Sequence, residues 1–419
     1  MNKCTLIIQP SIKSQEHKDL RSIEAKLEEA KGLALAIDLD IVLAEVVTLQ
    51  KKVPATYIGS GKVEEYAEFV ETNEIDLLIF NEQLTPIQQR NLEVALKCKV
   101  IDRTALILEI FGERANTKEG RLQVELAAQE YQKSRLVRSW THLERQRGGG
   151  GFMGGPGEKQ IESDRRAIRD RIAMIKKRIK KVAQTRDIQR QSRKKVPYDI
   201  VALVGYTNAG KSTLFNNITG ANVLAEDKLF ATLDPTMRIL KLPSGRKIII
   251  SDTVGFISDL PTQLVAAFRA TLEEVIEADV ILHVRDISNP DNTEQKNDVL
   301  KVLKSLGLEA KIQENMIEIS NKIDLLDNEN KKYISDKKDS VPVSAVTGEG
   351  IDNLFAKIDE KLSAKFLEEE VTISCQNGKA ISWVYANSKV LSEENDEEVM
   401  KMKILISEKD LGKLRKMIS

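Results

Sequence analysis

The chain is poor in the residues that stabilise secreted and membrane-spanning proteins. Its 419 residues include three cysteines, Cys4, Cys98 and Cys375, which lie far apart and form no C-x-x-C pair. Neither a disulfide framework nor a cysteine-based zinc site is therefore expected. The apolar run from Cys4 to Ile8 is too short for a signal-peptide core, and no stretch approaches the ~18 apolar residues of a membrane helix. These absences predict a cytoplasmic protein without membrane insertion.

The chain also has a formal net charge of zero, because its 64 lysines and arginines balance 64 aspartates and glutamates. Any attraction to nucleic acid must then come from local segregation of charge. Charged residues make up 31% of the chain and aromatic residues 5%, which is typical of a soluble protein rich in exposed helices. The histidines, His17, His142 and His283, show no metal-ligand spacing and are interpreted as structural.

A chain of this length exceeds one hydrophobic core, so two to three domains are expected. Residues 1–112 alternate apolar runs with amphipathic stretches, which predicts a parallel α/β domain. The expected strands span residues 4–9, 41–48, 75–81 and 99–101, and the expected helices span 15–36, 62–72, 86–96 and 105–111. The GSGK sequence at 59–62 lacks the full spacing of a phosphate loop and is interpreted as a strand-to-helix turn. Whether this domain binds ATP stays open.

Residues 113–196 differ, because two long helical patterns flank a glycine-rich run at 147–157. The apolar positions are Leu122, Leu126, Leu136, Trp140 and Leu143 in the first pattern, and Ile168, Ile172, Ile175, Ile179 and Val182, at coiled-coil spacing, in the second. Helices that must bury such seams should fold back as an antiparallel hairpin. The glycine run is interpreted as a mobile tip that carries Phe152 and Met153, with a plain flexible linker as the alternative.

The second helical pattern is strongly basic. From Arg165 to Lys195 it contains fourteen lysines and arginines against two aspartates, a net charge of +12. Such a block favours binding to a phosphate backbone through counterion release, and A-form RNA suits recognition by shape. A solvated charged face is the alternative interpretation.

Residues 197–363 carry the motifs of a nucleotide-binding domain with a doubly wound, mostly parallel sheet. A strand-like run at 200–204 leads into Gly205-Tyr206-Thr207-Asn208-Ala209-Gly210-Lys211-Ser212-Thr213, a phosphate-binding loop of the form G-x-x-x-x-G-K-S. Glycines allow backbone N–H groups to approach an anion closely. We expect Lys211 to contact the β- and γ-phosphates and Ser212 to bind Mg²⁺.

Three further segments follow predicted strands. Asp252-Thr253-Val254-Gly255 places a carboxylate near the Mg²⁺ shell and an N–H of Gly255 near the γ-phosphate. In Asn321-Lys322-Ile323-Asp324, the aspartate can accept hydrogen bonds from guanine N1–H and the 2-amino group, which adenine lacks. Ser344-Ala345-Val346 can donate a backbone N–H to guanine O6. The predicted ligands are therefore GTP and GDP.

A switch segment lies between these motifs, at Phe230-Ala231-Thr232-Leu233-Asp234. A threonine here should complete the Mg²⁺ shell while the γ-phosphate is present. Thr232 is preferred and Thr236 is the alternative, because spacing alone does not separate them. Lys211, Thr232 and Gly255 are thus the expected catalytic residues, and Ser212 and Thr232 the expected metal ligands.

The last segment, residues 364–419, is predicted to be a small α/β domain. Strands are expected at 381–386 and 402–407, a helix from 409, and an acidic loop at 393–398. No motif in it indicates a function.

The combined motifs resemble the HflX family of ribosome-associated P-loop GTPases, within the Obg-HflX superfamily. The matching stretches are RGGGGFMGGPGEKQ at 147–160, GYTNAGKST at 205–213, LFATLDPT at 229–236, DTVGF at 252–256 and NKID at 321–324. The resemblance implies a cytoplasmic, monomeric, Mg²⁺-dependent GTP hydrolase. It further implies binding to the large ribosomal subunit and its rRNA, and the splitting or rescue of stalled ribosomes under stress.

Many GTPases have a water-orienting glutamine where this chain has Phe256, which cannot hydrogen-bond to water. Intrinsic hydrolysis is therefore expected to be slow and to be stimulated by the ribosome. Asn208 resembles the asparagine of potassium-activated relatives, so K⁺ is a candidate cofactor. A GTPase of ribosome assembly or tRNA modification is the alternative, although it should lack the glycine-tipped hairpin. A signalling switch would not need the basic helix.

Overall fold

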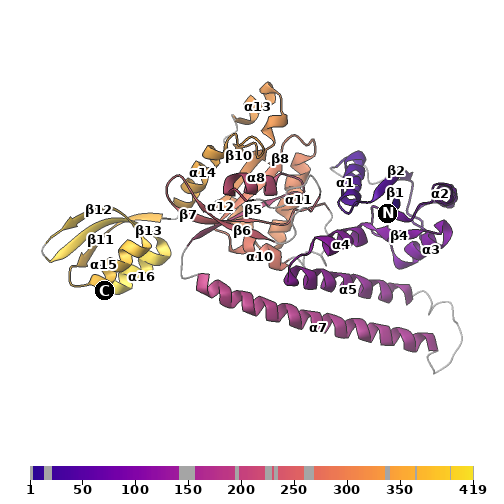
Figure 1. The fold of residues 1–419 in the computed structure, drawn as a ribbon, viewed down its shortest axis with the longest axis horizontal. Coiled ribbons are helices and arrows are strands. Elements are labelled where there is room, and N and C mark those ends of the chain that lie inside the picture. Colours follow the sequence, from indigo (N-terminus) through magenta and orange to yellow (C-terminus); the bar gives the residue numbers. More distant parts are fainter. Residues whose placement is uncertain are drawn as a thin grey trace.

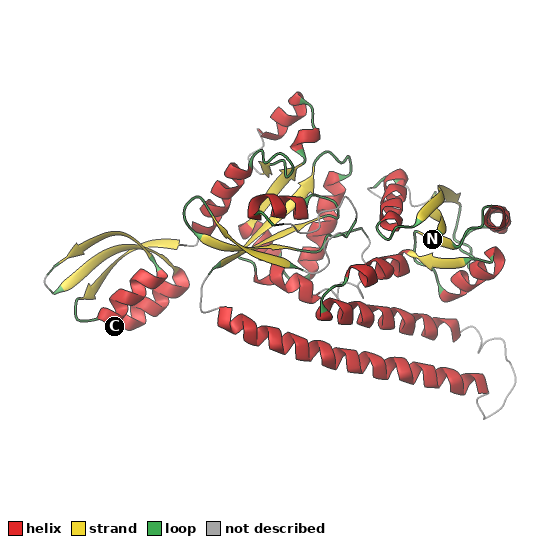
Figure 2. Ribbon diagram, viewed as in Figure 1, coloured by secondary structure: helices red, strands yellow, loops and turns green. Residues whose placement is uncertain are grey.

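The computed structural model of the chain describes residues 3–13, 21–140, 156–193, 198–221, 229–230, 235–258, 269–335, 340–363, 366–396 and 398–418. Within these residues the strands form three separate sheets flanked by helices, and two long helices run side by side below the first two sheets in this view (Figures 1 and 2). The prediction of a multidomain α/β protein with parallel sheets is confirmed. The domain boundaries stay a prediction.

The first sheet contains four parallel strands in the order β2-β1-β3-β4. Its elements are β1 (Cys4–Ile12), α1 (Ile23–Leu35), β2 (Asp40–Leu49), α2 (Ser60–Thr72), β3 (Leu77–Phe80), α3 (Pro86–Leu96), β4 (Lys99–Asp102) and α4 (Arg103–Arg114). Side chains alternate along β1, so Leu6 and Ile8 pack with α2 and α3, whereas Ile7 packs with α1 and α4. The core on the α1 and α4 side continues into the nucleotide-binding region.

Local capping decides where two of these helices begin. The helix predicted over 15–36 begins at Ile23, because the hydroxyl of Ser22 accepts a 3.1 Å hydrogen bond from the backbone N–H of Ala25. Residues 15–20 of that prediction lie outside the described residues. Helix α3 begins at the predicted residue, since Thr85 and Gln88 form a capping box.

The two long helices are α5 (Lys118–Trp140) and α7 (Pro156–Arg193). They pack side by side, and the predicted seam of α7 contains its most buried described residues, Ile172 and Ile175. An ion pair joins Arg171 of α7 to Glu125 of α5. Of the predicted glycine tip at 147–157, residues 147–155 lie outside the described residues.

Helix α5 is anchored to the first sheet through Asp102, the last residue of β4. Asp102 is fully buried and accepts hydrogen bonds from the hydroxyl of Tyr131 at 2.8 Å and from Arg135 Nη1 at 3.0 Å. The same carboxylate caps α4 by accepting from the backbone N–H of Ala105. The second half of α5 is therefore fixed relative to the first sheet.

The second sheet contains six strands in the order β10-β9-β8-β5-β7-β6, all parallel except β6. Its strands are β5 (Asp199–Gly205), β6 (Thr236–Lys241), β7 (Lys247–Asp252), β8 (Val280–Asp286), β9 (Met316–Asn321) and β10 (Ser340–Pro342). Its helices are α8 (Lys211–Thr219), α10 (Arg269–Glu277), α11 (Asn292–Ser305), α12 (Glu309–Asn315), η1 (Ile323–Leu325), α13 (Asn328–Ser335) and α14 (Ile351–Ser363). The parallel strands end at one edge of the sheet, where ligands bind in folds of this type.

The third sheet is antiparallel, in the order β11-β13-β12. Its elements are β11 (Phe366–Ser374), α15 (Gly378–Asn387), β12 (Lys389–Asn395), β13 (Val399–Ser407) and α16 (Glu408–Ile418). The strand predicted at 381–386 is wrong, because these residues lie in α15. Asn377 caps this helix, and Ala380 and Val384, one turn apart, bury its inner face. The predicted acidic loop at 393–398 is partly strand, since β12 continues to Asn395.

None of the helices in the described part of the chain combines the length and the apolar character that crossing a membrane requires.

Candidate nucleotide-binding site

The phosphate-binding loop runs from the end of β5 to the start of α8, and glycine is required at both of its ends. At Gly205 an added Cβ would lie 2.3 Å from the carbonyl oxygen of Val284. At Gly210, whose φ is +88°, it would lie 2.2 Å from Asn321 Nδ2. Neighbouring strands therefore approach too closely for any other residue, which matches the predicted G-x-x-x-x-G-K-S pattern.

Lys211 is the first residue of α8 and is 6% exposed. Its ammonium donates hydrogen bonds to the carbonyl oxygens of Tyr206, at 2.9 Å, and Gly205, at 3.3 Å. Burial lowers the pKa of Lys211 to about 8, partly opposed by the charge of Asp252. The loop thus holds a desolvated cation, which a phosphate would stabilise.

Ser212 and Asp252 bring two oxygen ligands together at the start of α8 and the end of β7. The hydroxyl of Ser212 donates a 2.6 Å hydrogen bond to Asp252 Oδ2. A hydroxyl beside a buried carboxylate suits Mg²⁺, which prefers oxygen ligands. The described residues contain no group of three or more His, Cys, Asp or Glu that is arranged to hold a metal.

Gly255 lies directly on the phosphate-binding loop. A Cβ added to it would meet Thr207 Cα at 2.9 Å and Lys211 Nζ at 3.1 Å. The contact is fixed on both sides, since Thr207 N–H donates to the carbonyl of Phe256 at 2.7 Å and Phe256 N–H donates to that of Gly205 at 3.1 Å. Phe256 is 2% exposed and its side chain packs in the core.

Asn321 joins the phosphate-binding loop to the predicted guanine-binding segments. Its Nδ2 donates to the carbonyl of Ala209 at 2.8 Å, and its Oδ1 accepts from Ala345 N–H at 3.0 Å. Asp324 Oδ1 accepts a 2.6 Å hydrogen bond from the hydroxyl of Ser344. The Asn321–Asp324 and Ser344–Val346 segments, predicted from separate motifs, therefore lie together.

The switch segment is only partly described. Ala231, Thr232, Leu233 and Asp234 lie outside the described residues, so the choice between Thr232 and Thr236 stays a prediction. Phe230 is buried, and its ring packs edge-on against Phe111 of α4 with the centroids 4.7 Å apart. Thr236 begins β6 and pairs with Asp252 of β7.

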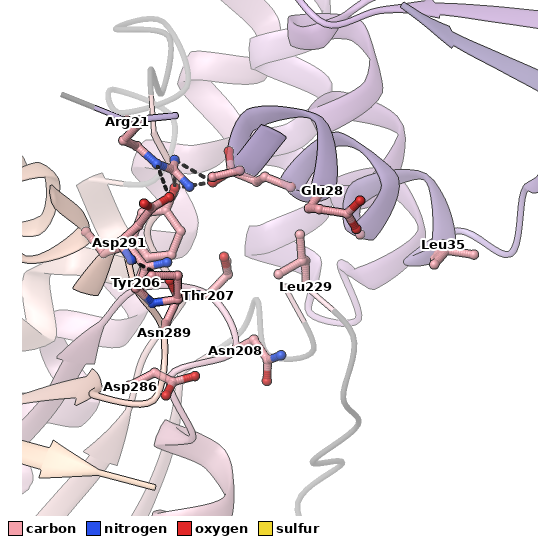
Figure 3. Close-up of a pocket in the computed structure, with 15 residues that line it drawn as sticks. Arg21, Glu28, Leu35, Tyr206, Thr207, Asn208, Leu229, Asp286, Asn289 and Asp291 are labelled. Carbon is pink, nitrogen blue, oxygen red and sulfur yellow. Dashed lines mark hydrogen bonds and ion pairs between the residues drawn. The ribbon is translucent and has the colours of Figure 1, made fainter. Parts of the chain in front are cut away.

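A cavity of about 400 Å³ lies between α1 and the phosphate-binding loop (Figure 3). Thr207 and Asn208 line it from the loop, and Glu28 and Leu35 line it from α1. Arg21, which lies over the ring of Tyr206, and Leu229 also line it. The carboxylate of Glu29 in α1 reaches across to Tyr206 in the loop. Sequence reasoning missed Glu29, because no motif marks a contact between residues so distant along the chain.

Four protein-family models match consecutive parts of the chain. They are described as GTP-binding GTPase N-terminal (residues 24–112), GTP-binding GTPase Middle Region (114–193), 50S ribosome-binding GTPase (200–322) and HflX C-terminal domain (330–418). A GTPase HflX from Magnetococcus marinus is 50% identical over 393 residues, which cover 93% of this chain and 90% of that protein.

Two further similar proteins come from Escherichia coli and Sulfolobus solfataricus. The Escherichia coli GTPase HflX is 42% identical, covering 92% of this chain and 88% of that protein. A crystal structure of a GTP-binding protein from Sulfolobus solfataricus in complex with GDP is 24% identical, with a TM-score of 0.45, covering 87% of this chain and 99% of that one.

Proposed function

We propose that this chain, which belongs to the GTPase HflX family and hydrolyses GTP, uses that hydrolysis to split or rescue stalled ribosomes under stress. The partner in this proposal is the large ribosomal subunit, which the family model over residues 200–322 names in its description. The site of action is the cytoplasm, and the chain acts as a monomer.

The nucleotide pocket supplies guanine recognition and phosphate binding. Asp324 accepts hydrogen bonds from the guanine edge, and Lys211 contacts the β- and γ-phosphates. Ser212 and Thr232 hold Mg²⁺, which neutralises charge on the phosphate oxygens. The position of Asp324 beside Ser344 supports this reading, because the hydroxyl orients the carboxylate before a base arrives.

Helix α7 supports an RNA partner. Its apolar seam is turned toward α5, while Arg166, Arg169, Lys177 and Arg178 are exposed to solvent. Exposed cations on a helix attract a phosphate backbone, and binding then releases counterions. These exposed cations are the observation that carries the ribosomal proposal.

Hydrolysis by the isolated chain is slow in this proposal. The side chain at the position of the usual catalytic glutamine is Phe256, which is apolar and packed in the core. Attack on the γ-phosphate then needs a group that the ribosome supplies or orders. A ribosome-bound chain should therefore turn over GTP faster than the free one.

Sedimentation with purified ribosomal subunits tests the proposal. The chain should travel with the large subunit when loaded with a non-hydrolysable GTP analogue, and less so with GDP. Asp324→Ala is the control, because it should lose the dependence on nucleotide while α7 stays intact. Sedimentation with the small subunit alone would favour ribosome assembly instead, and sedimentation with neither subunit would refute the ribosomal role.

A further inference from the structure

A buried polar cluster centred on Glu29 joins α1 to the nucleotide pocket. Both oxygens of this carboxylate are used: Oε1 accepts from Arg103 and from the hydroxyl of Ser258 at 2.8 Å, and Oε2 accepts from Arg21 at 2.8 Å and from the hydroxyl of Tyr206. Glu29 is 8% exposed. Two of its partners belong to the N-terminal region, and two belong to the nucleotide-binding region.

The two partners in the nucleotide-binding region are also bonded to each other. The backbone N–H of Ser258 donates a 2.7 Å hydrogen bond to the hydroxyl oxygen of Tyr206. Arg103 Nη2 donates to both the carbonyl oxygen and the hydroxyl of Ser258, each at 3.1 Å. The cluster therefore holds the backbone of Ser258, three residues after Gly255, from two directions.

The charges in the cluster stabilise the contact between α1 and the nucleotide-binding region. Burial alone would raise the pKa of Glu29, but Arg103, Arg21 and the hydroxyl of Tyr206 lower it to about 2. Burial and the charge of Glu29 raise the pKa of Tyr206, so its hydroxyl stays protonated and donates. Glu29 is thus an ionised acceptor across the physiological pH range.

Apolar contacts reinforce the same interface from the switch segment. Leu229 packs on α1 at Gly32, where an added Cβ would lie 3.0 Å from Leu229 Cδ1. The next residue, Phe230, packs on Phe111 of α4. The N-terminal region therefore contacts the nucleotide-binding region at two segments. One is at Leu229 and Phe230, and the other is at Ser258.

This arrangement conflicts with a bound γ-phosphate. Gly255 packs against Thr207 and Lys211, and Lys211 is almost wholly buried. A γ-phosphate in its proposed place, between the Lys211 ammonium and the Gly255 N–H, requires Gly255 to move away from the loop, because a Cβ at Gly255 would already lie 3.1 Å from Lys211 Nζ. Because Ser258 lies three residues further along and is held by Glu29 and Arg103, that displacement strains the cluster.

We propose that Glu29 is a positioning residue that holds Ser258, and through it Gly255, in the position that disfavours GTP relative to GDP. The proposal rests on the proposed roles of Lys211 and Gly255 in binding the γ-phosphate. Since coupling between two equilibria is reciprocal, weakening the Glu29 cluster raises affinity for GTP relative to GDP. GTP in turn loosens the contact between α1 and the nucleotide pocket.

The test measures the dissociation constants of GDP and of a non-hydrolysable GTP analogue for the full chain in Mg²⁺. In Glu29→Gln the ratio of the GDP constant to the analogue constant should rise at least about fivefold, at the low end of typical allosteric couplings. Ser258→Ala, which removes only a hydroxyl, should shift the ratio in the same direction and guards against misfolding of the first variant. An unchanged or lower ratio in both overturns the proposal.

The matched control is Glu318→Gln. Glu318 is also a carboxylate held by two cations, Arg285 and Lys296, and both of these lie outside the phosphate-binding loop and the segment after Gly255. In Glu318→Gln the ratio of the GDP constant to the analogue constant should equal that of the unmodified chain. A rise similar to that in Glu29→Gln would show that loss of any ion pair has this effect, and it would overturn the proposal.

Two further measurements separate the ways in which the idea can fail. Glu29→Gln combined with Ser258→Ala should shift the ratio no more than the larger single change, because both act through one contact; additive shifts contradict this.

Asp324→Ala tests the pocket itself. If that variant keeps full GDP affinity, the proposed nucleotide site fails, whatever the ratio in the Glu29 variant.

Discussion

The hydroxyl of Ser344 donates a 2.6 Å hydrogen bond to Asp324 Oδ1, and the hydroxyl of Ser212 donates a bond of the same length to Asp252 Oδ2. The two serine–aspartate pairs lie at or beyond the ends of parallel strands of the second sheet and serve opposite ends of the proposed ligand. In the proposed complex, the Ser344–Asp324 pair faces the guanine base and the Ser212–Asp252 pair faces the Mg²⁺ position. Each pair is therefore a matched control for the other.

The first prediction concerns guanine recognition. Asp324→Ala should weaken GTP binding by roughly 10²- to 10⁴-fold, because two charge-assisted hydrogen bonds of about 1.5–3 kcal/mol each are lost. ATP binding should not change, because adenine has neither of the two groups that Asp324 is proposed to bind. Titration with fluorescent GTP and ATP analogues measures both. Retention of GTP affinity in this variant contradicts the assigned pocket.

The second prediction concerns Mg²⁺. Removing the metal with a chelator should reduce hydrolysis by at least about 100-fold, since the metal contributes several kcal/mol of charge stabilisation. Ser212→Ala should raise the Mg²⁺ concentration needed for half-maximal activity, whereas Ser344→Ala should not. Equal Mg²⁺ dependence of the two serine variants would argue against Ser212 as a ligand of Mg²⁺.

The third prediction concerns pH and follows from the pKa of Lys211, which is about 8. Phosphate binding raises this pKa, so above pH 8 the complex takes up a proton and affinity falls as pH rises. Below pH 7 the lysine is charged in both states and affinity is independent of its titration. GDP affinity should fall roughly sevenfold between pH 7 and pH 8.8.

GMP is the control for this titration, because it lacks the phosphate that Lys211 is proposed to contact. Its affinity should stay constant over the same pH interval. A GDP affinity that is also constant up to pH 8.8 would show that Lys211 stays charged in the free chain.

The fourth prediction concerns salt. Reversing three exposed cations of α7, Arg169, Lys177 and Arg178, should weaken binding to the large subunit. The slope of log affinity against log salt should also fall by about 2–3, since each phosphate contact contributes about 0.7–0.9. Reversal of exposed cations on α16, such as Lys413 and Arg415, is the matched change and should leave the slope as it was.

Local signals account for most of what the sequence predicts correctly. Helix α3 begins where Thr85 and Gln88 cap it, and the glycines of the phosphate-binding loop lie where backbones meet. The strand predicted at 381–386 failed because its β-branched and aromatic residues favour a strand, while burial of Ala380 and Val384 along one helical face decides the structure. Tertiary packing overrode local propensity there.

The Glu29 cluster marks the limit of this kind of prediction. Its members Arg21, Glu29, Arg103, Tyr206 and Ser258 come from both halves of an interface and share no motif. A glutamate within an amphipathic helix is usually solvated, and single-sequence patterns carry no signal for a partner 229 residues away. Only the folded chain brings these charges together.

The anchoring of α5 at Asp102 has a mechanical consequence. The bond from Arg135 lies near the end of α5 at Trp140, so at 1.5 Å per residue only about 8 Å of helix separates it from that end. The start of α7 lies beside the same place, because Asp164 and Ile168 line a pocket together with Arg135. A movement of the first sheet is therefore passed directly, without a long lever, to the end of the helix pair that adjoins the glycine-rich run.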